Sequence, residues 1–139
     1  MSETQNIEYK SSWRDEFLRE ICGFANAQGG TLFVGKDDNG NIVGIENSKR
    51  LLEELPNKIT SILGIVADVN LHETKQGEYI EIIVEPQPNP VNYKGEYHYR
   101  SGSTKQELTQ LAIFSPSKSP KTAKIGFGQI FKFLIFNIL

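Results

Sequence analysis

A chain of 139 residues is long enough for one domain with a buried hydrophobic core. Residues 115–139 contain four lysines and no acidic residue, so residues 1–114 hold a net charge of −6 within a total of −2. This acidic body excludes a general polyanion-binding protein, and any nucleic-acid site must be local. The single cysteine, Cys22, excludes an intrachain disulfide, and its apolar neighbours predict a buried, inert thiol.

Two helices are predicted from apolar residues that recur every three or four positions. The first covers Trp13–Ala27, with Ser12 as its N-cap and Asp15 three residues later as in a capping box. The second covers Ser48–Leu63, and Pro56 inside it predicts a kink or a break into two pieces.

Strands are predicted between and after these helices, where β-branched and aromatic residues alternate with turn signals. The segment 36–41 is a strong turn signal, so the strands on either side of it are expected to form a hairpin. Prolines at 86, 88 and 90 predict an extended connector, and a second hairpin is expected after it. The expected strands are Thr31–Gly35, Ile42–Ile45, Val66–Glu73, Glu78–Glu85, Val91–Tyr93 and Tyr97–Arg100. The sequence therefore predicts an α+β fold, a mixed sheet with hairpins and two main helices packed on it.

The last part of the chain differs in composition from the rest. A short helix is expected from Thr104 through Leu111, then a linker rich in serine, proline and lysine, then the apolar residues 126–139. This apolar tail is too short to span a bilayer, so no membrane span is expected. Docking on the domain or on a second copy, as in a homodimer, is the favoured interpretation of the tail. A membrane-surface anchor and an abnormal end of the reading frame are the alternatives. We accordingly divide the chain into a domain at residues 1–111 and a linker with tail at 112–139.

Five sequence blocks carry a family resemblance, and they occur in order over residues 3–108. They are Ile7–Ser12, Phe24–Gly35, Asp37–Ile45, Pro90–Val91 and Tyr97–Thr104. The chain resembles the Schlafen AlbA-like domain family, which includes many bacterial transcriptional regulators. The resemblance implies a nucleic-acid-binding fold, with DNA the favoured partner. It does not extend to the tail.

The resemblance also implies a candidate activity, because some Schlafen proteins are metal-dependent endoribonucleases built on three carboxylates. Glu3 and Glu8 stand five residues apart, as in that pattern, and Asp37 or Asp38 follows the glycine-rich strand, with Asp38 favoured. The catalytic candidates are therefore Glu3, Glu8 and Asp38, with Glu8 and Asp38 as ligands of Mg²⁺ or Mn²⁺ if the chain is a nuclease. The Asp37–Gly40 segment is foremost a hairpin turn, and no cofactor is otherwise implied.

A second set of candidates lies where the chain passes through Tyr97–Arg100 into a loop. On a strand, Tyr97 and Tyr99 face one way while His98 and Arg100 face the other, which gives an aromatic face for bases and a cationic face for phosphates. Ordinary sheet packing with a solvated cation is the alternative. Lys10 either pairs with Glu8 on one strand face or faces a phosphate. The nucleic-acid-binding candidates are Lys10, Tyr97, Tyr99, Arg100, Ser101, Ser103 and Lys105.

The favoured function is therefore a nucleic-acid-binding domain of a transcriptional regulator. A metal-dependent endoribonuclease and an oligomerisation module are the alternatives, and a binding domain is favoured over an enzyme. Residues 1–10 contain no apolar run, which is not the pattern of a secretory signal peptide, so a cytoplasmic location is expected.

Overall fold

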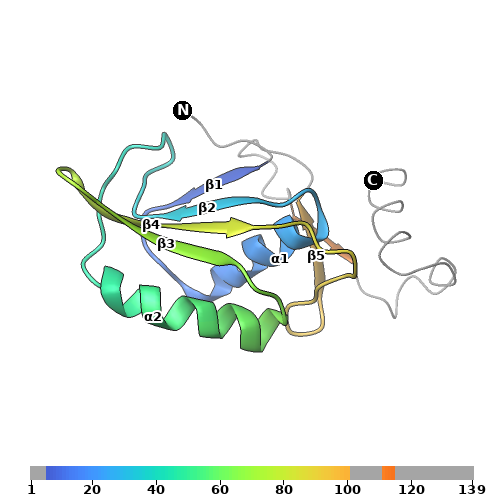
Figure 1. Cartoon of the computed structure of the whole chain (residues 1–139). Helices are drawn as coiled ribbons and strands as arrows, with labels where there is room; N and C mark the ends of the chain where they lie inside the picture. Colours follow the sequence, from blue (N-terminus) through green and yellow to red (C-terminus); the bar gives the residue numbers. More distant parts are fainter. Residues whose placement is uncertain (1–5, 101–110, 115–139) are drawn as a thin grey trace, which may run out of the picture.

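A computed structural model describes residues 6–100 and 111–114 of the chain. Its main sheet has the strand order β1-β2-β4-β3, formed by β1 (Ile7–Lys10), β2 (Gly30–Val34), β4 (Gly77–Val84) and β3 (Asp68–Thr74) (Figure 1). β1 is parallel to β2, whereas β4 is antiparallel to both of its neighbours. A second sheet has two antiparallel strands, β5 (Tyr97–Arg100) and β6 (Leu111–Phe114).

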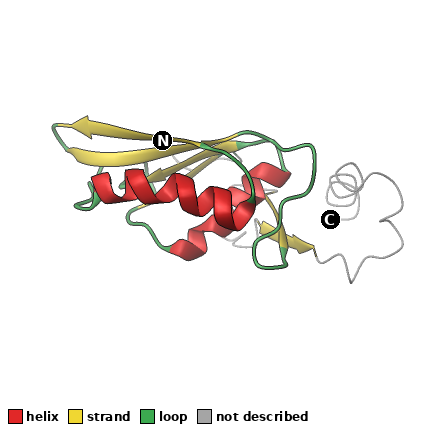
Figure 2. Cartoon of the chain, turned by 60° about the horizontal axis from the view of Figure 1, so that its bottom comes forward, coloured by secondary structure: helices red, strands yellow, loops and turns green. Residues whose placement is uncertain are grey.

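Two main helices lie on the same side of the four-stranded sheet (Figure 2). A 3-10 turn, η1 (Asp15–Phe17), leads into α1 (Leu18–Asn26), and α2 (Ser48–Lys58) continues into a π-helical turn, η2 (Ile59–Leu63). The α+β architecture predicted from the sequence is thereby confirmed. No helix in the described part of the chain is both long enough and apolar enough to cross a membrane.

The hydrophobic core fills the space between the helices and the near side of the sheet. Alternate residues of β2 and β4 point into it because successive side chains of a strand face opposite sides. The predicted burial of Cys22 is confirmed, and this burial raises the pKa of its thiol to about 11. The largest core side chains are Leu18, Ile21, Phe24, Leu32, Leu55, Ile59, Ile80 and Ile82.

The start of the first helix differs from the prediction. Arg14 has an extended backbone, with φ −137° and ψ 141°, and helical structure begins only at Asp15. The Asp15 carboxylate, which was expected to complete a capping box, instead accepts a hydrogen bond from the Trp13 indole and pairs with Lys58. Helix α2 also differs, because it runs through Pro56 and changes to the π-helical pattern only at Ile59.

Both predicted hairpins are shorter than expected. The first reduces to one bridge between Lys36 and Ile42, because the N–H groups of Val43 and Gly44 both donate to the Gly35 carbonyl. The second reduces to a bridge between residues 93 and 96, and β5 pairs with β6 instead.

The end of the predicted domain also differs in detail. Leu111 lies in strand β6, where the end of a short helix was expected, and β6 runs three residues beyond the predicted boundary at 111. The start of that helix, at Thr104, and the apolar tail lie outside the described residues.

Candidate nucleic-acid interface

Four charged side chains meet where β1, α1 and β5 come together. We call Glu8, Lys10, Glu20 and Arg100 the charged cluster. Arg100 Nη1 lies 2.6 Å from Glu8 Oε1 and 3.7 Å from Glu20 Oε1. Lys10 Nζ lies 3.3 Å from Glu8 Oε2 and 3.9 Å from Glu20 Oε2. The cluster therefore contains two positive and two negative groups, and its charges balance.

The register of the sheet places this cluster on the helix side. Glu8 and Lys10 pair with Leu32 and Val34, which are core residues of β2, so all four point toward the helices. The Arg100 side chain is only 1% exposed, and its guanidinium also donates to the Ile7 carbonyl at 3.1 Å. Burial raises the pKa of Glu20, and the nearby Lys10 ammonium opposes that change.

A buried amide lies beside the cluster, at the end of α1. Asn26 Nδ2 donates to the carbonyls of Val91 and His98, at 2.7 and 2.8 Å, and Asn26 Oδ1 accepts from the Val91 N–H at 2.7 Å. One side chain thus joins α1 to the proline-rich connector and to β5. This side chain gives hydrogen-bond partners to three backbone groups of the connector and β5.

The opposite side of the sheet carries a row of rings, one from each strand. We call this side the open face, because no helix of the described residues covers it (Figure 2). Neighbouring ring centroids along the row are 5.7, 6.0 and 4.9 Å apart, so the contact is continuous from β1 to β3. The aromatic row, in strand order, is Tyr9, Phe33, Tyr79 and His72.

Lys36 places a positive charge over this row. Its Nζ lies 4.0 Å from the Phe33 ring centroid, 4.4 Å from Tyr79 and 6.0 Å from Tyr9. Within residues 6–100, Lys36 forms no ion pair with a carboxylate, whereas Lys10 and Lys58 each pair with two. The open face therefore combines aromatic surface with a cation whose charge is not neutralised by a described neighbour.

Comparison with known proteins identifies the family. The model of the family described as Schlafen, AlbA_2 matches residues 3–109, which is more than half of the chain. The chain belongs to the Schlafen, AlbA_2 family. The resemblance seen in the sequence blocks is thus confirmed.

Two solved structures resemble this AlbA_2 domain. The DIP2311 protein from Corynebacterium diphtheriae has 17% sequence identity and a TM-score of 0.62, over 88% of this chain and 27% of that protein. This chain therefore spans about a quarter of the DIP2311 structure. The N-terminal domain of a RecG-related protein from Nitrosomonas europaea, named for an ATP-dependent DNA helicase, has 20% identity and a TM-score of 0.49. It matches over 64% of this chain and 69% of that domain. At these identities the DIP2311 likeness supports the fold alone.

The structure departs from the cationic face expected on β5 of the AlbA_2 domain. Arg100 is buried against Glu8, and the Tyr99 side chain is fully buried, so neither presents a surface to solvent. The packing of β5 against α1 buries Arg100, and the alternation of residues in a single strand cannot reveal that packing. Tyr97 is half-buried, and Lys10 is 22% exposed. Ser101, Ser103 and Lys105 lie outside the described residues.

The described carboxylates do not fit a metal site. No group of three or more His, Cys, Asp or Glu side chains that could hold a metal ion occurs within the described ranges, and Glu3 lies outside them. Both oxygens of Glu8 already face cations, Arg100 and Lys10. Asp38 is exposed in the turn after β2.

The neighbouring Asp37 has a structural part in the same turn. Its carboxylate accepts hydrogen bonds from the N–H groups of Asn39 and Asn41, each at 2.9 Å. The bond from Asn41 is the main reason that the pKa of Asp37 is lowered. The alternative interpretation of 37–40 as a hairpin turn therefore describes Asp37 well.

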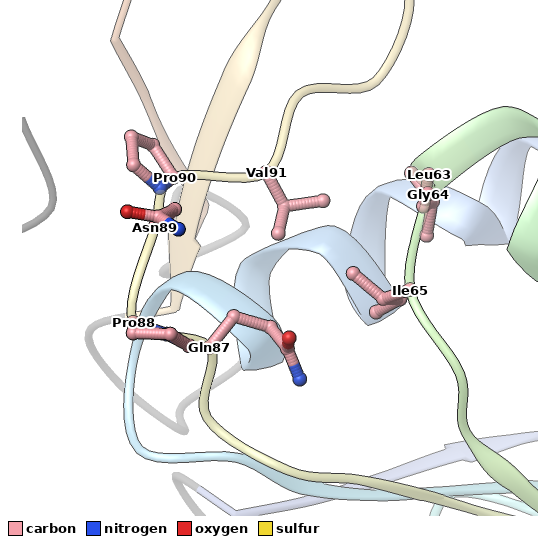
Figure 3. Close-up of a pocket in the computed structure, with 8 residues that line it drawn as sticks. All are labelled: Leu63, Gly64, Ile65, Gln87, Pro88, Asn89, Pro90 and Val91. Atoms are coloured by element: carbon pink, nitrogen blue, oxygen red, sulfur yellow. The ribbon is translucent and has the colours of Figure 1, made fainter.

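A shallow pocket of the AlbA_2 domain lies away from both sites, between the end of η2 and the proline-rich connector (Figure 3). It is lined by Leu63, Gly64, Ile65, Gln87, Pro88, Asn89, Pro90 and Val91. None of these side chains is ionisable, so the pocket offers no side-chain acid or base.

No residue of the aromatic row was among the candidates predicted from the sequence. The signal for the row is present as period-two alternation, because Phe33 lies between the core residues Leu32 and Val34, and Tyr79 precedes the core residue Ile80. Such alternation shows which residues share one face of a strand. It does not show which strands are neighbours, and that order is what assembles the aromatic row.

Proposed function

We propose that this AlbA_2 domain binds nucleic acid, and that it does so through the open face. The observation that carries the proposal is the position of the Lys36 ammonium, within 4.5 Å of two ring centroids and without a described carboxylate partner. The net charge of the chain is −2, so a phosphate backbone needs a local cation of this kind. DNA binding within a transcriptional regulator is the finer form of the proposal.

The segment that follows β5 is proposed as a second region of contact. Ser101, Ser103 and Lys105 supply hydroxyl groups and a cation suited to phosphates. Arg100, held by Glu8, is then a positioning residue that fixes where this segment leaves β5. Lys10 has the most exposed side chain of the charged cluster, and we propose that its ammonium contacts the ligand.

Fluorescence anisotropy with labelled DNA and RNA, single- and double-stranded, tests the proposal. The wild-type chain should bind in low salt, and Lys36→Ala should weaken binding and flatten its salt dependence by about one phosphate contact. Lys49→Ala is the matched control, because Lys49 is an exposed lysine of α2 on the other side of the sheet. Absence of binding to every probe would refute the proposal.

The same experiment addresses the nuclease alternative. Adding Mn²⁺ to the RNA probe and following its length by electrophoresis measures cleavage directly. Cleavage that disappears in Glu8→Gln, while the variant remains folded, would support the alternative. The pairing of Glu8 with two cations favours binding without cleavage.

A further inference from the structure

We infer that the aromatic row is a stacking site for unpaired bases, so that the ligand of the open face is single-stranded nucleic acid. This inference rests on the proposed function and specifies its ligand. It is carried by the rings of the row, by the position of Lys36 above them, and by the charges that share the face.

The aromatic row is not required by the hydrophobic core. None of its four residues belongs to the core cluster, which occupies the helix side of the sheet. Phe33 and Tyr79 are half-buried and the His72 side chain is 41% exposed, whereas Tyr9 at the β1 end is buried. The sheet thus presents partly exposed rings on three neighbouring strands.

Ring faces select unpaired nucleotides over duplex. In a double helix each base lies between its neighbours in the stack, and its flat surface is not offered to a protein. Unpaired bases can leave that stack and lie on aromatic side chains, which accept any base because every base has a π-face. An aromatic row on the face of a sheet therefore fits a single strand better than it fits the outside of a duplex.

Lys36 gives the row its charge complementarity. Its ammonium lies over the faces of Phe33 and Tyr79, and an arriving base would replace it there. The long lysine side chain can then move aside to reach the phosphate of the same nucleotide. One residue thereby covers the rings in the unbound domain and contacts the backbone in the complex.

Acidic groups of the open face set the path of the strand. Glu81 is directly opposite Phe33 in the β2–β4 register, and its carboxylate lies 3.0 Å from His72 Nε2. Asp68 is exposed further along β3. Repulsion from these carboxylates should keep the phosphates of the strand close to Lys36, with the bases directed toward Tyr79 and His72.

The test compares a labelled single-stranded oligothymidylate and oligouridylate with a labelled duplex, using the full chain in each titration. Phe33→Leu and Tyr79→Leu keep apolar surface but remove a ring, and each should weaken single-strand binding about tenfold. Tyr93→Leu is the control, because Tyr93 is a half-buried ring of the connector that packs on the core instead. Circular dichroism and thermal unfolding establish that each variant is folded.

The outcomes separate the inference from the proposed function. Duplex binding that is lost in Lys36→Ala but unchanged in both leucine variants would overturn the stacking site and leave nucleic-acid binding intact. Failure to bind any probe would overturn both. A concentration-dependent dimer that dissociates in Phe33→Leu, with no single-strand binding, would show that a second copy occupies the face and would also overturn the inference.

Discussion

Replacing Glu8 by glutamine should destabilise the domain strongly, although the two side chains have almost the same shape. The change removes one of the two negative charges of the charged cluster, and Arg100, only 1% exposed, is left with a neutral amide in place of the carboxylate that lies 2.6 Å away. Glu20 remains 3.7 Å from the guanidinium and compensates in part. We therefore expect the lower end of the range for a broken buried pair, about 3 kcal/mol. For a domain of this size that loss lowers Tm by about 10 °C.

Urea unfolding followed by circular dichroism measures this loss, and two further variants make the result interpretable. Lys10→Met removes a cation that is 22% exposed, against 1% for Arg100, so it should cost less than Glu8→Gln. Combining Glu8→Gln with Arg100→Met should cost less than the two single changes added together, because no uncompensated charge is left buried. If Glu8→Gln were no more costly than Lys10→Met, the reasoning from burial would be refuted.

Three other changes give independent expectations. Asn26→Ala leaves three backbone groups of the connector and β5 without their partner, so the free energy of unfolding should fall by about 3 kcal/mol. The control is Asn57→Ala, at an exposed asparagine, which should lower it by less than about 0.5 kcal/mol. Burial raises the pKa of Glu20, so the folded state keeps a proton that the unfolded chain releases. The stability of the wild type relative to Glu20→Gln should therefore be greatest below about pH 4.5 and fall as pH rises through the folded-state pKa, which urea titrations at several pH values would show. Gly30→Ala should lower Tm, because a Cβ there would overlap the ring of the fully buried Phe24; an unchanged Tm would mean that the core can shift.

Local patterns predicted most of the secondary structure, and the failures have a common cause. The apolar period of α1 and the alternation in β4 depend on residues close in sequence; β4 formed near its predicted bounds, and α1 ends within one residue of its predicted end. Asp15 was predicted to cap a helix, but it accepts from Trp13 and pairs with Lys58, which is 43 residues away. A capping motif spans only a few residues, so it contains no information about a partner as distant in the chain as Lys58.

The candidate site was harder to predict for the same reason. The sequence pattern predicted a strand that ends at Arg100, just before the loop. Only the packing of α1 on β5 decides that the Arg100 guanidinium is buried. The aromatic row takes one ring from each strand of the order β1-β2-β4-β3. That order is a property of the whole sheet, so no window of the sequence contains it.

The long separation of Glu8 and Arg100 has a consequence for how the domain folds. These two residues are 92 positions apart in the chain, so their contact closes a large loop and is expected to form late. A contact absent from the transition state affects the rate of unfolding and leaves the rate of folding nearly unchanged. The charged cluster would then slow the unfolding of the native state while having little effect on how fast the chain folds.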